Sequence, residues 1–362
     1  MAIWKIDELG EFVTLKRGYD LPQQKRKNGE IPIFSSSGVT GTHNEAMVEA
    51  PGVITGRYGT IGEVFFAETS FWPLNTTLYV ENFHENDEKF VYYFLKTLEW
   101  KKFASASAVP GINRNTVHIE IVRFPDFETQ QKIASVLSTI DKKIAVNKAI
   151  NDNLEQQAAA LFSSLYNRSN TEVRYTDLIQ ILGGGTPKTG ETAYWNGNIA
   201  FFTPKDVGTP YTFITEKTIT EEGLSHCNSR LYPVNTVFVT ARGTVGKVGL
   251  SGIPMAMNQS CYALVGKETH QLLVYFYTLK AVDRLKHKAS GAVFDAITTR
   301  DFDSEQIMKL SDDDAKAFLC VAEPMFQEML NNSIENLRLS TLRDFLLPKL
   351  MSGEIDVSSV QL

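Results

Sequence analysis

The sequence predicts an α+β fold with two strand-rich domains in a pseudo-twofold arrangement, separated by two long antiparallel helices that form a coiled-coil spacer. Residues 126–168 carry apolar side chains at alternating steps of four and three, which is the pattern of a coiled-coil seam. The same seam returns near the C-terminus, and the strand-rich region before the first seam also recurs before the second. Self-similarity of this kind indicates a duplicated unit.

The first seam extends over more than four heptads. At about 1.5 Å per residue it would span roughly 50 Å, which is too long for one small core to wrap. Its positions are Ile133, Leu137, Ile140, Ile144, Asn147, Asn151, Leu154, Ala158, Leu161 and Leu165. The second seam follows 185 residues later, at Phe318, Ala322, Met325, Met329, Asn332, Asn336, Leu339, Arg343, Leu346 and Leu350. Both asparagines recur in place, which a chance match would not produce.

The pattern divides the chain into five segments. They are a first strand-rich domain (1–125), a first long helix (126–168), a second strand-rich domain (169–310), a second long helix (311–352) and a C-terminal tail (353–362). β-Branched and aromatic runs predict strands in both domains. In the first domain they lie within 31–38, 52–67 and 76–82, before a helix over 88–107. In the second they lie within 199–206, 236–252 and 259–266, before a helix over 272–290.

A short glycine-rich repeat supports the duplication. The stretch TGRYGTIG at 55–62 matches TARGTVG at 240–246 if one residue is deleted, which pairs Arg57 with Arg242. Downstream, Asn75 and Tyr79 match Asn258 and Tyr262.

The ends of the long helices are also readable. Asp126, after Pro125, is placed to cap the first helix, and Ser311 with the acidic residues that follow it is placed to cap the second. Pro324 lies inside the second helix, where proline is expected to kink or split it.

Composition bounds the class of protein. The chain has 362 residues, 43% of them hydrophobic, and no secretory signal pattern or apolar run long enough for a membrane span. Its three cysteines include no CxxC pair, so we expect reduced thiols in the cytoplasm. The net charge of −6 disfavours a protein that grips nucleic acid by bulk charge alone, but it allows local basic loops.

The apparent catalytic motifs fail on geometry. Pro125-Asp126 with Asp141-Lys142-Lys143 fits a loose PD-(D/E)xK nuclease pattern, but its carboxylates lie a helix length apart instead of converging on a metal. The stretch 243–247 resembles a phosphate loop without its first glycine or its hydroxyl residue. No HxxxH or HExxH pair is present, and no [DN]PP[FY] tetrapeptide of an amino-methyltransferase. No catalytic motif and no metal site is therefore expected.

Several longer segments are similar to those of a known family. They are QQKIASVLSTIDKKI (130–144), GGGTPKTGETAYWNGNIAFFTPKDV (183–207), RGTVG (242–246) and LLPKLMSGEIDV (346–357). With them the chain resembles the specificity (S) subunit of Type I restriction-modification systems over essentially its whole length. The resemblance implies two target recognition domains that each read one half of a bipartite, asymmetric site in double-stranded DNA.

The resemblance also implies partners and cofactors. It implies docking to two methyltransferase (M) subunits and, through them, to restriction (R) subunits. S-adenosylmethionine, ATP and Mg would then be bound by these partners and none by this chain, and the methyltransferase would flip out the target adenine. At the second helix Pro324 and SDDDAK replace the QQKI-like segment, so docking there is expected to differ in detail.

Candidate DNA contacts lie in the two glycine-flanked turns and at nearby strand ends. Arginine, lysine, serine, threonine and asparagine supply groove and phosphate hydrogen bonds, while glycine permits close approach. The candidates are Ser36, Ser37, Arg57, Tyr58, Thr60, Asn113, Arg114, Lys188, Lys205, Arg242, Thr244, Lys288 and Ser290. The alternative is that these are ordinary β-turns whose arginines only brace the backbone.

The asparagines of the seams are the candidates for setting helix register. With antiparallel helices, Asn147, Asn151, Asn332 and Asn336 would meet at the centre, where buried amides must pair. The alternative is that they lie at an exposed crossing. For the whole chain, two other functions remain open: a degenerate or fused methyltransferase or nuclease, and a coiled-coil scaffold that binds protein.

Overall fold

The computed structural model describes residues 3–105, 110–288 and 296–361. The chain forms two compact units. Unit 1 consists of Met1–Val146 and Asn336–Leu362, and unit 2 consists of Asn147–Glu335.

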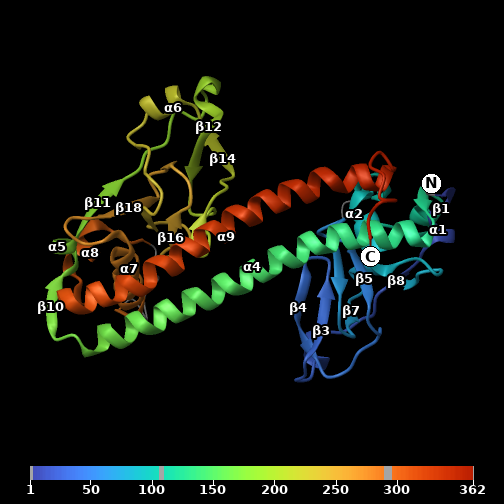
Figure 1. Cartoon of the computed structure of the whole chain (residues 1–362), viewed down its shortest axis with the longest axis horizontal. Coiled ribbons are helices and arrows are strands. Elements are labelled where there is room, and N and C mark those ends of the chain that lie inside the picture. Colours follow the sequence, from blue (N-terminus) through green and yellow to red (C-terminus); the bar gives the residue numbers. More distant parts are fainter. Residues whose placement is uncertain (1–2, 106–109, 289–295, 362) are drawn as a thin grey trace. The chain divides into compact units, whose positions relative to one another are not determined.

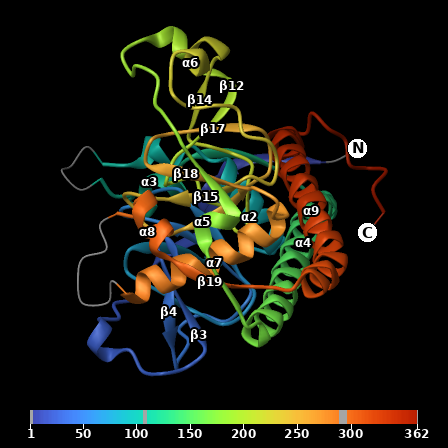
Figure 2. The same cartoon turned by 90° about the vertical axis from the view of Figure 1, so that its left-hand side faces the viewer.

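Two long helices, α4 (Phe127–Arg168) and α9 (Asp312–Ser352), each contribute one part to both units. Their bounds agree with the expected helices to within a residue. Within each unit the two helices run antiparallel and side by side (Figures 1 and 2).

Within the described residues, unit 1 contains three sheets. A two-stranded sheet pairs β1 (Trp4–Glu8) with β9 (Ile121–Pro125). The four-stranded sheet has the order β2 (Thr14–Arg17), β8 (Thr77–Asn82), β5 (Gly52–Gly56), β6 (Val64–Ala67). The three-stranded sheet has the order β4 (Gly38–His43), β3 (Ile31–Ser35), β7 (Trp72–Pro73).

The described part of unit 2 repeats this plan. Its two-stranded sheet pairs β10 (Thr171–Arg174) with β19 (Gln306–Lys309). The five-stranded sheet has the order β11 (Ile179–Gly183), β18 (Cys261–Gly266), β15 (Val237–Thr240), β16 (Val248–Ser251), β13 (Tyr211–Thr212). The three-stranded sheet has the order β14 (Lys217–Ile219), β12 (Trp195–Phe202), β17 (Met255–Met257). The expected duplication is therefore present strand by strand, with β13 added in unit 2.

Shorter helices connect these strands. Unit 1 has α1 (Leu9–Phe12), α2 (Glu88–Thr97), α3 (Arg114–His118) and the 3-10 helices Gln23–Lys25 and Trp100–Phe103. Unit 2 has α5 (Tyr175–Leu178), α6 (Glu221–Ser225), α7 (Gln271–Lys288), α8 (Thr299–Ser304) and the 3-10 helix Thr192–Tyr194.

The helix expected over 88–107 is wrong in its second half, because α2 ends at Thr97. Leu98 leaves the helical region at φ −71° and ψ 140°. The buried Trp100 then turns back, and its Nε1 donates to the carbonyl of Leu95 at 2.8 Å. In a continuing helix that carbonyl would accept a backbone N–H from the next turn. Here the Trp100 side chain supplies the donor, which satisfies the carbonyl at the end of α2.

The starts of both long helices are capped as expected. Asp126 accepts the backbone N–H of Thr129 at 3.0 Å, and Ser311 Oγ accepts that of Asp314 at 3.2 Å. These bonds satisfy donors that the first turn leaves unpaired. Pro324 does not split the second helix: α9 is continuous across it. Pro324 is exposed, while Phe326 and Met329 of the following turns are buried in the core of unit 2, to which this stretch belongs.

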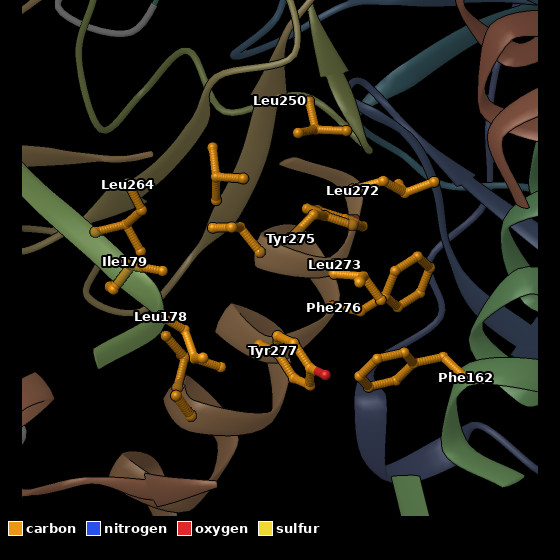
Figure 3. Close-up of a cluster of buried hydrophobic side chains, with 14 of the residues drawn as sticks. Phe162, Leu178, Ile179, Leu250, Leu264, Leu272, Leu273, Tyr275, Phe276 and Tyr277 are labelled. Carbon is orange, nitrogen blue, oxygen red and sulfur yellow. The ribbon is translucent and has the colours of Figure 1, made fainter. Parts of the chain in front are cut away.

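The core of unit 2 joins the long helices to the globular part. Figure 3 shows Phe162 of α4 directed at Phe276 of α7, and their ring centroids are 5.0 Å apart. The ring of Phe318 of α9 packs edge-on against both, with ring centroids 5.5 Å from that of Phe162 and 5.2 Å from that of Phe276. Burying aromatic rings of this size contributes about 1.5–3 kcal/mol each. Phe318 of the second seam therefore packs on α7 of the globular part as well as on Phe162 of the other long helix.

No helix within the described residues combines the length and apolar character needed to cross a bilayer.

Candidate nucleic-acid interface

Two turns occupy equivalent places in the two units. The first turn (residues 56–62) joins β5 to β6, and the second turn (residues 240–246) joins β15 to β16. Matching backbone bonds close both turns, from Gly62 N to Gly56 O at 3.4 Å and from Gly246 N to Thr240 O at 2.9 Å.

Glycine is required at matching positions of both turns. Gly59 and Gly62 have φ of +73° and +87°, and Gly243 and Gly246 have φ of +79° and +73°. These left-handed conformations are strained for residues with a side chain. The two loops therefore share a backbone geometry, as the repeat in the sequence predicts.

The hydrogen-bond register fixes which residues correspond. Thr76 O accepts the N–H groups of Arg57 and Tyr58 at 2.9 and 3.2 Å in unit 1. Ser260 O accepts those of Ala241 and Arg242 at 2.8 and 3.2 Å in unit 2. The next contact agrees, because Ile112 N donates to Arg57 O and Ile297 N donates to Ala241 O.

The pairing of Arg57 with Arg242 is therefore wrong. Arg57 corresponds to Ala241, and Tyr58 corresponds to Arg242, with no residue deleted. Matching identical letters introduced a gap that the backbone does not have. The same shift changes the downstream pairs: because Ile54 faces Tyr79 and Phe238 faces Ala263, the counterpart of Tyr79 is Ala263 instead of Tyr262.

Asn75 is shifted in the same way, with Gln259 as its counterpart. Each has a side-chain partner in the segment after an edge strand of the larger sheet, β2 or β11, since Asn75 Nδ2 donates to Asp20 and Thr186 Oγ1 donates to Gln259. These matched polar pairs were missed as site candidates because neither stands out in composition.

Arg57 is engaged in bracing contacts. It is half-buried, its Nε donates to Ile112 O at 3.0 Å, and its guanidinium lies 4.6 Å from the centroid of the Tyr58 ring. The Tyr58 ring lies against Gly111, where a Cβ would be 2.1 Å from its Cε1. Arg57, Tyr58 and the 111–112 segment thus form one packed group.

Ser36 and Ser37 lie in the tight turn between β3 and β4. A Cβ placed on Gly59 would lie 3.4 Å from Ser36 Oγ, so the first turn and the serine turn are in contact. Ser37 is exposed, and its Oγ is 3.0 Å from Ser35 Oγ. Thr60 is exposed on the first turn itself.

Asn113 and Arg114 begin the helix that follows the bracing segment. Both are exposed, and the Asn113 side chain caps α3 by accepting the N–H of Asn115 at 3.0 Å. An Arg114 Nη lies 3.5 Å from Leu15 O at the edge of the sheet. His118 Nε2 accepts the N–H of Leu15 at 2.9 Å. Burial, then the Arg114 charge, lower the pKa of His118, which keeps the ring neutral and able to accept.

In unit 2 the exposed candidates Arg242 and Thr244 lie on the second turn. A Cβ on Gly243 would lie 4.0 Å from Pro204, so the exposed Lys205 is one residue from the turn. Lys286 of α7 was missed by the sequence analysis. A Cβ on Gly246 would lie 2.6 Å from its Cε, so it packs directly against the second turn. Lys205, which also lies 3.4 Å from Glu216, and Lys286 are therefore lysines near the exposed Arg242 and Thr244.

The remaining candidates lie elsewhere. Lys188 is exposed in the loop after β11, and its carbonyl accepts Trp195 Nε1 at 3.1 Å. Lys288 ends α7 and forms an ion pair with Glu305, whose side chain is fully buried. Arg284 lies 3.5 Å from the other carboxylate oxygen of Glu305. Lys288 therefore has a structural role, because it neutralises a buried carboxylate. Ser290 lies outside the described residues.

The two carboxylates of the loose nuclease pattern have different hydrogen-bond partners. Asp126 caps α4, whereas Asp141 accepts bonds from Tyr93 at 2.6 Å and Arg343 at 2.8 Å. Burial, reinforced by Asp206, raises the pKa of Cys261 to about 12, which keeps this thiol protonated near neutral pH.

The polar positions of the seam are hydrogen-bonded inside unit 2. Asn332 Nδ2 donates to Asn151 Oδ1 at 3.0 Å, and Asn147 Nδ2 donates to Glu335 at 2.6 Å. Asn147 is fully buried and Asn332 is 6% exposed, so neither lies at an exposed crossing. Asn336 belongs to unit 1. That the four asparagines set helix register stays a prediction.

Comparisons with known proteins bear on both units. The family model described as the Type I restriction modification DNA specificity domain matches residues 1–156 and 167–309. The chain is similar to the Type I restriction enzyme HindI specificity subunit of Haemophilus influenzae, with 25% identity over 72% of this chain and 75% of that protein. It is also similar to the Type I restriction enzyme EcoR124I/EcoR124II specificity subunit of Escherichia coli, with 28% identity over 52% of this chain and 50% of that protein.

A solved structure has the same fold. The crystal structure of the S subunit of a Type-I restriction-modification system from M. genitalium matches with a TM-score of 0.65, 17% sequence identity, and 96% of both chains covered. The matches in sequence and in fold thus extend over both halves of the chain.

Proposed function

We propose a function from the premise that this chain belongs to the family of Type I restriction modification DNA specificity domains. The family model covers both halves, and the relatives are specificity subunits of Type I restriction enzymes. The chain is a non-catalytic specificity subunit of a Type I restriction-modification system.

Each unit, in this proposal, reads one half of a bipartite, asymmetric site in double-stranded DNA. The observation that carries it is the equivalence of the two turns, which share their backbone bonds but present different side chains. Sequence is read by side chains at base edges, whereas a shared backbone fixes how each domain approaches the groove. One scaffold with different side chains suits two different half-sites.

The first turn would contact one half-site together with Ser36, Ser37, Asn113 and Arg114. The second turn would contact the other half-site together with Lys205 and Lys286. The net charge of −6 supports a division of labour in which partner subunits contribute much of the phosphate neutralisation.

The proposed partners are two methyltransferase subunits and, through them, restriction subunits. S-adenosylmethionine, ATP and Mg are proposed to bind those subunits, because methyl transfer to a flipped adenine and DNA translocation need chemistry outside this chain. The proposed place of action is the cytoplasm, where the DNA of the cell and reduced thiols are found. The three cysteines are free.

The long helices are proposed to set the gap between the half-sites, with the asparagines as register points. A mismatched register would place buried amides against apolar side chains, at a cost of about 1–3 kcal/mol each. Four residues inserted after Asn151 should therefore lengthen the unspecified gap while both half-sites stay the same. Retention of the original gap by this variant would exclude the spacer role.

A binding comparison tests the proposal. The chain co-expressed with the methyltransferase subunits of its own system should select one DNA sequence from a random duplex pool at physiological salt. The isolated chain should bind DNA weakly and without selection, and should not bind S-adenosylmethionine. Tight, selective binding by the isolated chain, or binding of S-adenosylmethionine to it, would contradict the proposed division of labour.

A further inference from the structure

The two arginines of the turns have different environments. The register places Arg57 at the position of Ala241, and Tyr58 at the position of Arg242. Arg57 is half-buried and bonded to a backbone carbonyl, whereas Arg242 is exposed. Within the described residues the Arg242 guanidinium has no hydrogen bond or ion pair. Residues that look alike in sequence therefore differ in their freedom to contact a ligand.

The backbone beneath Tyr58 and Arg242 is fixed in the same way in both units. Each residue donates its N–H to the carbonyl of the residue that precedes β8 or β18, which is Thr76 in unit 1 and Ser260 in unit 2. Each also forms an antiparallel bridge to a later segment, Tyr58 to Gly111 and Arg242 to Ala296. A side chain on a pre-organised backbone loses less entropy when it binds, so this shared position is suited to recognition.

Unit 1 has a brace at this position that the described residues of unit 2 do not show. The Arg57 Nε bond to Ile112 O is 3.0 Å long, and the guanidinium covers the Tyr58 ring from one side. Gly111 also lies against the ring, because a Cβ there would be 2.1 Å from Tyr58 Cε1. At the Arg57 position unit 2 has Ala241, whose short side chain can brace nothing.

We propose that Tyr58 and Arg242 occupy the specificity-determining position of their units, and that Arg57 is a positioning residue that orients Tyr58. This inference rests on the proposed function. Arg242 presents a planar fork of donors, which matches the N7 and O6 acceptors of guanine in the major groove. Tyr58 presents one hydroxyl, which can satisfy a single base-edge group.

The test uses the chain co-expressed with the methyltransferase subunits of its own system. Methylation rates are measured on a set of duplexes that carries every single base-pair change in both half-sites. Arg242→Ala should lose a preference of about 5- to 150-fold at one guanine of one half-site and leave the other half-site unchanged. Arg242→Lys keeps the charge but loses the fork, so it should lose the same preference. Lys247→Ala, which removes a neighbouring exposed charge, should preserve it.

Arg57 is tested by coupling to Tyr58. If Arg57 acts through Tyr58, Arg57→Ala and Tyr58→Ala should relax the same base pair of the other half-site, and the double variant should be no worse than Tyr58→Ala alone. Gly111→Ala, whose Cβ would displace the Tyr58 ring, should reproduce the effect. This variant keeps the test informative if Arg57→Ala fails to fold.

Two results would overturn the inference. One is that Arg57→Ala relaxes a different base pair from Tyr58→Ala with additive effects, since Arg57 would then read a base itself. The other is that Arg242→Ala slows all duplexes equally. A wild-type complex that methylates without sequence preference would instead contradict the proposed function, so the two failures are distinguishable.

Discussion

Asn332 of α9 donates a 3.0 Å hydrogen bond from its side-chain amide to Oδ1 of Asn151 on α4, inside unit 2. Asn151 in turn donates to Met329 O at 3.2 Å and Ser333 Oγ at 3.1 Å. Both seams place an asparagine at this point, so a polar contact replaces an apolar one between the two helices in unit 2.

Replacing one partner should cost more than replacing both. Asn332→Leu leaves the side-chain oxygen of the half-buried Asn151 without its donor, and we expect a loss of about 1–3 kcal/mol. Asn151→Leu/Asn332→Leu should cost less than the two single variants added together. Hydrogen exchange of the α4 and α9 peptides of unit 2 measures both effects. Asn153→Leu, at an exposed position of α4, is the control, and strictly additive costs would show that the amides are not coupled.

The two glycines of the first turn should differ in tolerance. Both have positive φ, which costs an alanine about 1–2 kcal/mol. A Cβ on Gly62 would also lie 2.8 Å from Trp100 Cβ, whereas on Gly59 the nearest atom would be Ser36 Oγ at 3.4 Å. Gly62→Ala should therefore lower the midpoint of thermal unfolding more than Gly59→Ala. Equal shifts would mean that backbone strain alone decides.

The duplication and the long helices could be predicted because they are long, repeated signals. Ten seam positions per helix agree on one periodicity, and the structure buries or half-buries all ten positions of the first helix. The correspondence between the turns could not be predicted in the same way. Sequence identity aligns Arg57 with Arg242. The backbone bonds to Thr76 O and Ser260 O instead align Arg57 with Ala241.

The contacts of α7 were equally hidden from the sequence. Lys286 reaches the second turn, and Lys288 reaches Glu305, only because the helix packs across its unit. Nothing in the local sequence marks Glu305 as a fully buried carboxylate. Its burial is a tertiary property, so the sequence alone does not reveal that Lys288 pairs with it.

Lys288 should affect stability instead of base preference. Removing it leaves the buried Glu305 with Arg284 as its remaining cation among the described residues, and an under-compensated buried charge is destabilising by about 1–3 kcal/mol. Lys288→Ala should lower the thermal midpoint, and Lys288→Ala/Glu305→Gln should recover part of the loss. Methylation rates on single-base-pair variants of the site provide the check, since a changed preference at one base pair would restore Lys288 as a DNA contact.

The cap of α4 should give unit 1 an acid-dependent stability. Burial alone would raise the pKa of Asp126, but the N–H groups of Thr129 and Ile3 donate to its carboxylate and hold the pKa below its ordinary value. Because the folded-state pKa is depressed, this stabilisation is present above the unfolded pKa of about 3.9 and is lost as pH falls through the folded value.

Asp126→Ala should therefore lower stability near pH 7 by about 0.5–2 kcal/mol, and the difference from wild type should shrink below about pH 4. Urea unfolding at a series of pH values measures it. Asp126→Asn retains a capping oxygen without the charge, so its stability should lie between those of the wild type and Asp126→Ala. A deficit of Asp126→Ala that stays constant down to pH 2 would argue against the cap as its origin.

The central claim is that two equivalent units read two halves of one DNA site. Mapping every methylated adenine produced by the complex of this chain with its own methyltransferase subunits tests it most directly. We expect all methylated sites to share two specified blocks separated by a constant number of unspecified base pairs. A single continuous recognition sequence, or methylation without a shared sequence, would contradict the claim.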